Sequence, residues 1–202
     1  AASDVYKRQR YDHVFTSADY NNTWVQIQVP FTDFAHVDGT GDGTFTGNLD
    51  EVVFVIANVQ GGDPSTVEVD LDLVELVDGT VAPPPATLII DDFNDGDASD
   101  WGAFNGSQGG GGIGVAADRP QEGSHYLSTG WGGSGGGGFY GGTFKNLDDG
   151  AQITPPSNPE FSVWVFNQSD ATSDGFQLEI TIREDNGGDG WDGFGNGDDS
   201  FR

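Results

Sequence analysis

Three side chains able to contact a sugar alternate along one predicted strand, residues 23–30. Trp24, Gln26 and Gln28 share one side of that strand, and aliphatic residues occupy the other. Indole rings pack well on the apolar faces of sugar rings, and amides exchange hydrogen bonds with hydroxyl groups. The pattern makes all three residues candidate ligand contacts. The alternative is that Trp24 packs beneath a loop.

Two further aromatic candidates lie in a glycine-rich segment, residues 130–142. Trp131 and Tyr140 are separated there by serine, phenylalanine and many glycines. Glycine permits unusual backbone angles and close approach, so such a loop can present rings at the rim of a cleft. The alternative is a low-complexity loop with no binding role. Trp164, in contrast, lies on a strand that is apolar on both faces, and we predict that it is a core residue.

Acidic side chains gather at two places where their carboxylate oxygens could bind a metal ion. Asp91, Asp92 and Asn94 end or follow a predicted strand, residues 88–93. Asp70 and Asp72 alternate with aliphatic residues along 66–73, which predicts that the acids face outward and that Leu73 faces inward. Calcium prefers six to eight oxygen ligands, so these groups are candidate calcium ligands. The alternative is a solvated acidic edge that discourages strand pairing.

Catalytic patterns are missing from the sequence. A glycosidase needs two carboxylates at a fixed separation, one of them in an apolar pocket. Nearly all acids here lie in glycine-rich loops or at outward-facing strand positions, and no Gly-x-Ser-x-Gly elbow occurs. The three histidines are scattered without metal-ligand spacing. We therefore expect no enzyme and no catalytic residues.

The charge balance narrows the classes of partner. The chain has 33 acidic and 7 basic residues, a formal net charge of −26. This charge argues against nucleic acid and against anionic membrane surfaces, and it suits a neutral partner, a cation or a salty medium. The alternative is that the acids only solvate the surface. No apolar run approaches the ~20 residues of a membrane helix. The absence of cysteine excludes disulfides and cysteine-bound metals.

Alternating strands separated by Gly- and Asp-rich turns predict an all-β sandwich or jelly roll. A Pro-rich linker, residues 80–87, separates residues 10–79 from residues 88–202. The first nine residues, AASDVYKRQ, look like a translated sequencing adapter, so residues 1–9 are left out of the fold prediction.

Four segments of the sequence resemble those of a known family. They are LIIDDFNDGDASDW after the linker, and WVQIQVPFTDF, GNLDEVVFVIANV and TVEVDLDLVEL before it. They resemble β-sandwich carbohydrate-binding modules related to carbohydrate-binding module family 11, within the galactose-binding-like superfamily. The resemblance implies a jelly roll that binds polysaccharide without catalysis. It also implies a structural calcium held by Asp92 and Asp72, with Asp70, Asp91 and Asn94 as additional candidates.

The motifs occur in inverted order, because the opening motif follows the closing one. A tandem array explains this: residues 10–79 would end one module and residues 88–202 would begin the next. The two parts are expected to close into one circularly permuted sandwich, with residues 88–93 pairing beside residues 66–76. The resemblance implies a bacterial exported protein, secreted or at the cell surface, with further copies of the module. The alternative function is a calcium-stiffened, adhesin-like surface repeat without sugar specificity.

Overall fold

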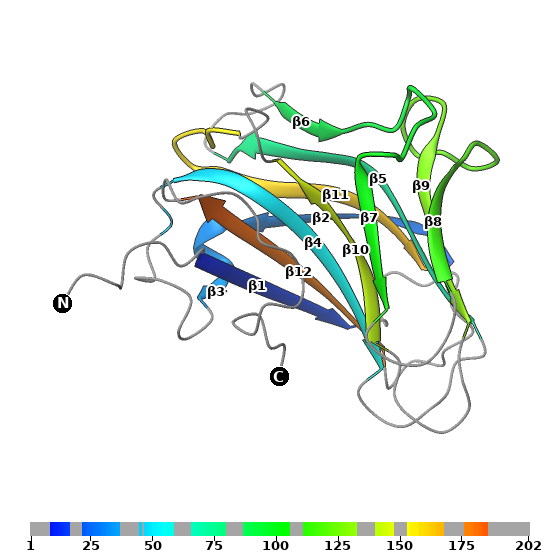
Figure 1. Cartoon of the computed structure of the whole chain (residues 1–202). Helices are drawn as coiled ribbons and strands as arrows, with labels where there is room; N and C mark the ends of the chain where they lie inside the picture. The colour runs from blue at the N-terminus through cyan, green and yellow to red at the C-terminus, as the bar shows by residue number, and fades with distance from the viewer. Residues whose placement is uncertain are drawn as a thin grey trace.

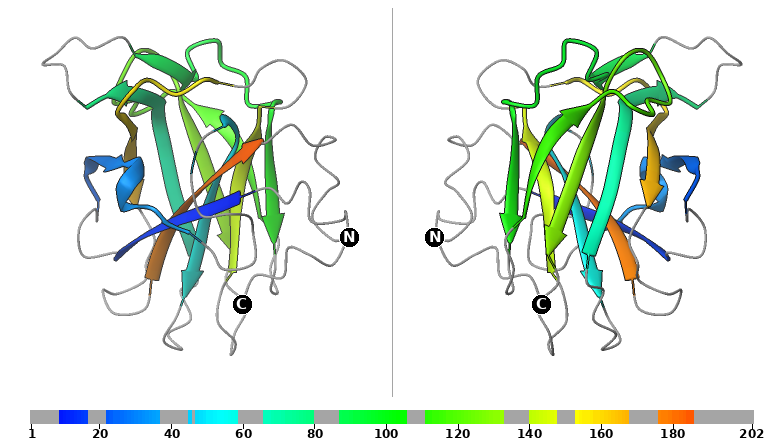
Figure 2. Two further views of the ribbon diagram at one scale, coloured as in Figure 1. Left: turned by 90° about the vertical axis from the view of Figure 1, so that its left-hand side faces the viewer. Right: turned by 90° about the vertical axis from the view of Figure 1, so that its right-hand side faces the viewer.

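The computed structural model describes residues 9–16, 22–36, 45, 47–58, 66–79, 87–105, 111–132, 140–147, 153–167 and 176–185. Most of these residues lie in β-strands that form two antiparallel sheets, one in front of the other in Figure 1. The side views of Figure 2 show the same two layers. The predicted all-β sandwich is confirmed, while the jelly-roll topology and the circular permutation stay predictions. In the described ranges, no helix has the length and hydropathy to cross a bilayer.

Six strands form the first sheet, called sheet A here, in the order β3-β1-β12-β4-β10-β7. Sheet B has the order β2-β11-β5-β9-β8, and β6 pairs additionally with β5. The strands of sheet A are β1 (Gln9–Thr16), β3 (Ala35–His36), β4 (Asn48–Asn58), β7 (Trp101–Asn105), β10 (Tyr140–Asn146) and β12 (Phe176–Asp185). Those of sheet B are β2 (Trp24–Pro30), β5 (Thr66–Asp78), β6 (Leu88–Asp91), β8 (Gly111–Ala116), β9 (Tyr126–Gly132) and β11 (Pro159–Asn167).

Strands from both sides of the linker interleave in each sheet. In sheet A, β12 lies between β1 and β4, and in sheet B, β11 lies between β2 and β5. The predicted pairing of residues 88–93 with residues 66–76 is observed, since β6 pairs with β5 through Val74 and Asp91. Neither part of the chain therefore forms a sheet of its own among the described residues.

The core fills the space between the sheets with aliphatic and aromatic side chains from nearly every strand. Residues 52–56 of β4 are all buried, as expected for a strand that is apolar on both faces. Trp101 is 5% exposed and packs against Phe54 and Phe93, so it is part of the core. Each such side chain contributes about 1.5–3 kcal/mol when fully buried.

Strand β5 contains an irregularity that alternation along the sequence does not predict. Leu73 has a positive φ of 43°, and the register with β6 and β11 shifts next to it. Val69 and Leu71 are core residues before this bulge, whereas Val74 and Leu76 are core residues after it. The prediction that Leu73 faces the core is therefore wrong. Because of the bulge, Asp72 and Glu75 share the outer face of sheet B although they are three residues apart.

The glycine-rich segment 130–142 is not one continuous loop. Trp131 belongs to β9 in sheet B and pairs with Val67 and Gly111, whereas Tyr140 belongs to β10 in sheet A and pairs with Ala57. Glycines here continue the strands because their backbone groups join the ladders on both sides. The two predicted ligand contacts thus belong to different sheets. Their side chains lie outside the described part of the structure.

Candidate functional site

Nine side chains form three rows across the outer face of sheet B, the face that points away from the core. Each row has one residue from β2, one from β11 and one from β5, placed side by side by the strand register. The first row is Gln28, Ser162 and Glu75; the second is Gln26, Trp164 and Asp72; the third is Trp24, Phe166 and Asp70.

The third row is closed by a covering loop, residues 117–125. The indole Nε1 of Trp24 donates to the Arg119 carbonyl oxygen at 2.9 Å. The Trp24 ring packs on Phe166 and edge-on against Tyr126, with centroids 5.4 and 5.7 Å apart. The Arg119 guanidinium lies over both of those partner rings. Trp24 thus follows the alternative interpretation, packing beneath a loop.

Carboxylates of β5 hold the covering loop on the sheet. Arg119 forms ion pairs with Asp70 at 2.5 Å and with Glu68 at 2.9 Å. One carboxylate oxygen of Asp72, Oδ2, accepts hydrogen bonds from the backbone N–H groups of Gln121 and Glu122 at 2.8 and 2.9 Å. Asp70 and Asp72 do face away from the core, as predicted, but both are fully buried by this loop.

Burial changes the ionisation of these acids. Desolvation raises the pKa of Asp70 to about 7, against the opposing pull of Arg119. Desolvation also raises the pKa of Asp72, although the backbone amides of Glu122 and Gln121 oppose it. The pKa of Glu75 is raised by burial and by nearby Glu122, and a hydrogen bond from Ser162 opposes the shift.

The accessible side chains of the first and second rows are Gln28, Gln26 and Trp164, whereas Ser162, Glu75 and Asp72 of the same rows are buried. Gln26 and Gln28 are exposed, and Gln26 Nε2 donates to the Ser162 hydroxyl at 3.2 Å. Trp164 is half-buried, and its neighbours along β11, Val163 and Val165, are fully buried in the core. Trp164 therefore belongs to the outer face.

The prediction that Trp164 is a core residue is wrong for a physical reason. Strand β11 is an interior strand of its sheet, as predicted, but only one of its faces meets the other sheet. Alternation with Val163 and Val165 was the signal that could have placed Trp164 outward. Ser162, Arg119 and Glu75 were also missed as members of the site, because only the register and the covering loop bring them there.

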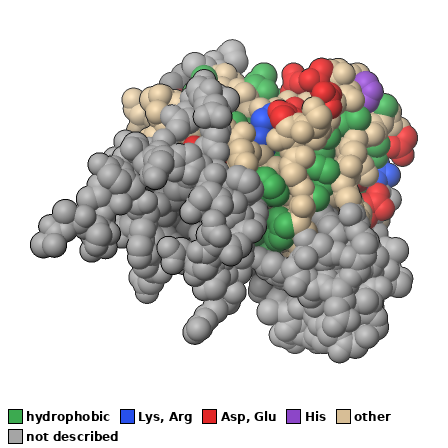
Figure 3. Space-filling model, viewed as in Figure 1, with side chains coloured by type: hydrophobic (Ala, Val, Ile, Leu, Met, Phe, Trp, Pro, Cys, Tyr) green, Lys and Arg blue, Asp and Glu red, His purple; other side chains and the backbone are tan. Residues whose placement is uncertain are grey.

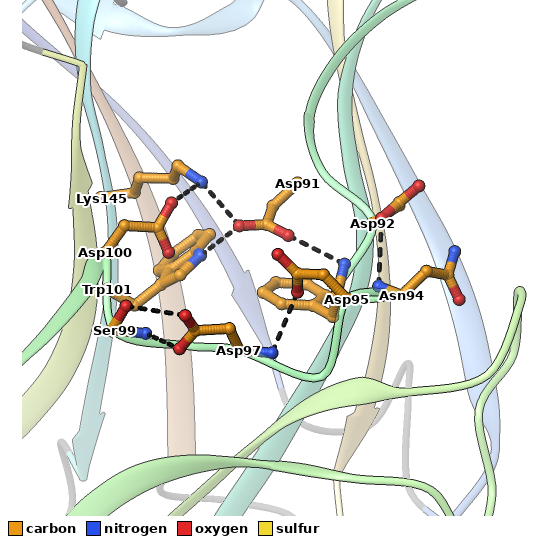
Figure 4. A network of polar contacts seen from close by, with 10 residues as sticks. Asp91, Asp92, Asn94, Asp95, Asp97, Ser99, Asp100, Trp101 and Lys145 are labelled. Atoms are coloured by element: carbon orange, nitrogen blue, oxygen red, sulfur yellow. Dashed lines mark hydrogen bonds and ion pairs between the residues drawn. The ribbon is translucent and has the colours of Figure 1, made fainter.

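The second acidic group lies at the end of β6 and in the turn that follows, at the top of Figure 3. Asp91 Oδ2 accepts hydrogen bonds from Lys145 Nζ at 2.6 Å and from Trp101 Nε1 at 2.8 Å. Its other oxygen accepts the backbone N–H of Phe93 at 2.8 Å. Lys145 also pairs with Asp100, and Figure 4 shows the ammonium between the two carboxylates. Burial would lower the pKa of Lys145, but its hydrogen bonds to Asp100 and Asp91 raise it.

The remaining predicted ligands in this turn cap backbone amides. Asp92 Oδ1 accepts the N–H of Asn94 at 3.1 Å, and Asn94 Oδ1 accepts the N–H of Ser124 at 2.6 Å. Asp95 and Asp97 accept backbone N–H groups two residues ahead in the same way, as Figure 4 shows. The contacts of Asp92, Asp95 and Asp97 are Asx turns, in which a short acidic side chain replaces a backbone acceptor, whereas Asn94 joins this turn to the covering loop.

The five predicted calcium ligands therefore divide between two groups. Asp70 and Asp72 hold the covering loop, whereas Asp91, Asp92 and Asn94 stabilise the turn after β6. Among the described residues, no three His, Cys, Asp or Glu side chains lie in an arrangement that could hold a metal ion. Lys145 already supplies a positive charge to Asp91. These residues do not fit a calcium site, and bound calcium stays a prediction.

Comparison with known proteins adds no further constraint. A scan against models of protein families finds no match, and a search of curated proteins finds no significant relative.

Proposed function

We propose that this chain is a non-catalytic carbohydrate-binding module that holds a polysaccharide across the outer face of sheet B. The observation that carries the proposal is Trp164, a half-buried indole beside the exposed amide of Gln26 and one row from Gln28. An aromatic ring flanked by amides suits a sugar, which has apolar ring faces and a rim of hydroxyls.

The size of the platform supports an extended ligand. Three neighbouring strands span ~10 Å across the sheet, and successive rows lie ~7 Å apart along the strands. Trp164 and Gln26 in the second row and Gln28 in the first are the side chains that a ligand can reach, and they extend over two rows and two strands. Ser162 and Glu75 lie buried beside them.

The position of the buried acids supports binding rather than catalysis. Asp70 and Asp72 lie beneath the covering loop and already interact with Arg119, Gln121 and Glu122. A glycosidase acid must contact the bond that it protonates. The exposed groups of the first two rows are amides, which do not transfer protons.

Trp164→Ala tests the proposal directly. We expect at least a tenfold loss of affinity for the best ligand in a panel of soluble polysaccharides, because a central indole in a binding site commonly contributes more than ~1.4 kcal/mol. Affinity electrophoresis ranks the panel, and calorimetry measures the loss. Thr32→Ala, at an exposed position on the short 3-10 helix Phe31–Asp33, is the matched control. Failure of every glycan to bind, or an unchanged affinity in a folded Trp164→Ala variant, would overturn the proposal.

A further inference from the structure

Three carboxylates in or next to the first two rows have no cationic partner among the described residues. Asp72, Glu75 and Glu122 form no ion pair within the described ranges. Arg119, the basic residue of the covering loop, pairs instead with Glu68, Asp70 and Asp118. The backbone N–H of Glu122 donates to Asp72 Oδ2 at 2.9 Å, and the charge of Glu122 raises the pKa of both Asp72 and Glu75.

A second observation at the same place also indicates a missing partner. Asp72 is fully buried, yet its Oδ1 has no hydrogen-bond partner among the described residues. A buried carboxylate oxygen without a partner is costly, and a nearby positive charge reduces that cost. The strand register places Asp72 directly beside Trp164, so the unsatisfied oxygen belongs to the aromatic row.

The aromatic ring and the acids favour the same kind of ligand. The face of an indole attracts cations as well as apolar surfaces. A metal ion needs several oxygens in a defined geometry, which no group of described acids provides. An ammonium group on a sugar needs only negative potential and hydrogen-bond acceptors. Uronate polymers are disfavoured, because the chain carries a net charge of −26.

We propose that the first and second rows select sugars that carry a protonated amine, such as glucosamine polymers, over neutral and anionic sugars. The sugar ring stacks on Trp164 while its ammonium group lies against the exposed Glu122, in the field of the buried Glu75 and Asp72. This inference rests on the proposed function and specifies its ligand class.

The test compares hexamers of glucosamine, N-acetylglucosamine and galacturonate at a pH where the amines are protonated. We expect the glucosamine hexamer to bind at least ~10-fold more tightly than its acetylated form, a modest gain for one charge near several carboxylates. The galacturonate hexamer should bind most weakly. Calorimetry at two salt concentrations measures all three affinities.

Matched variants separate local recognition from attraction to an acidic protein. Glu122→Gln and Glu75→Gln should each reduce the ratio of glucosamine to N-acetylglucosamine affinity severalfold. Asp95→Asn makes the same change in net charge in the turn after β6, and should leave the ratio unchanged. A lysine hexamer serves as a cation without a sugar ring, and Trp164→Ala should weaken glucosamine binding more than lysine binding.

Each failure has its own meaning. Equal affinity for the glucosamine and N-acetylglucosamine hexamers, or an unchanged ratio in Glu122→Gln and Glu75→Gln, overturns the amine preference and leaves the carbohydrate-binding proposal intact. Lysine binding as tight as glucosamine binding also overturns it, because the sugar then contributes nothing. No binding of any glycan overturns the proposed function itself.

Discussion

Two groups of acidic residues lie on either side of the pairing between β5 and β6, and they differ in their hydrogen-bond and ion-pair partners. Asp91 has a lysine, an indole N–H and a backbone amide as partners, so each of its oxygens is satisfied. Asp72, on β5, has two backbone amides on one oxygen and no hydrogen-bond partner on the other. The Asp91 group is fully partnered among the described residues, whereas Asp72 has no cationic partner there although Arg119 pairs with the nearby Asp70.

The difference separates a structural role from a binding role. Removing the cationic partner of an internally paired carboxylate destabilises the fold. Such a carboxylate has no unpaired oxygen with which to bind a ligand. A group of carboxylates with too few cations lowers the stability of the fold, and binding of a cationic ligand raises that stability again. The number of acids in each stretch of sequence is similar, so only the partners distinguish the two groups.

The largest effect is expected at the Asp91 group. Lys145→Met should lower the free energy of unfolding by about 3 kcal/mol, because it leaves the mostly buried Asp91 without its cation. Urea denaturation measures the change. The double variant Lys145→Met with Asp91→Asn should cost less than the two single variants added together. Additive costs would show that the Lys145–Asp91 pair does not stabilise the fold.

A smaller effect, which depends on pH, is expected at Asp70, the buried carboxylate of β5 that pairs with Arg119. The pKa of Asp70 rises from 3.8 in the unfolded chain to about 7 in the fold, so the folded state binds the proton more tightly between these values. The contribution of Asp70 to stability is therefore largest below pH 4 and is lost as the pH rises through 7. Relative to Asp70→Asn, the native protein should gain about 2 kcal/mol between pH 8 and pH 5.5.

Urea denaturation of both proteins at the two pH values checks this difference. Arg119, Glu68 and the backbone N–H of Thr129 face Asp70 in both measurements, and Tyr126 lies beside them with its pKa raised by burial. If the native protein instead loses stability relative to the variant on acidification, the Arg119 ion pair outweighs the burial of Asp70.

Within the outer face, Trp24 and Trp164 should respond in opposite ways. Trp24→Phe removes the hydrogen bond to the Arg119 carbonyl oxygen and should cost about 1 kcal/mol of stability. Glycan affinity should change less than twofold, since the ring lies under the covering loop. Thermal denaturation and calorimetry measure the two quantities. A tenfold loss of affinity in Trp24→Phe would move the site to the third row.

The smallest effect is expected from calcium. Addition of 1 mM calcium should stabilise the protein by less than ~0.1 kcal/mol, as for a site with a dissociation constant above ~10 mM. Thermal denaturation with calcium and with a chelator measures this, and magnesium is the control. A clear rise in melting temperature with calcium alone would favour the calcium-stiffened surface repeat over the present interpretation.

The sequence was sufficient for the class of fold and for much of the strand pattern. Alternation located β2 and β5, and the two-sided apolar run around Trp164 located the interior strand β11. The alternation rule failed at Leu73, because a bulge with positive φ reverses the alternation and no glycine in the sequence marks it. The site was harder to predict, because only strand register places Trp164 beside Asp72, and Arg119 reaches Asp70 from a loop.

Two residues near opposite ends of the described chain, Arg10 and Arg183, are direct neighbours on adjacent strands. A ribosome must therefore have made residues 176–185 before the edges of β1 and β4 that face β12 can find their partner. Until then the emerging polypeptide exposes two unpaired strand edges, which tend to pair with strands of other chains and aggregate. Assembly of this shell is consequently late and slow compared with that of a helical protein of equal size.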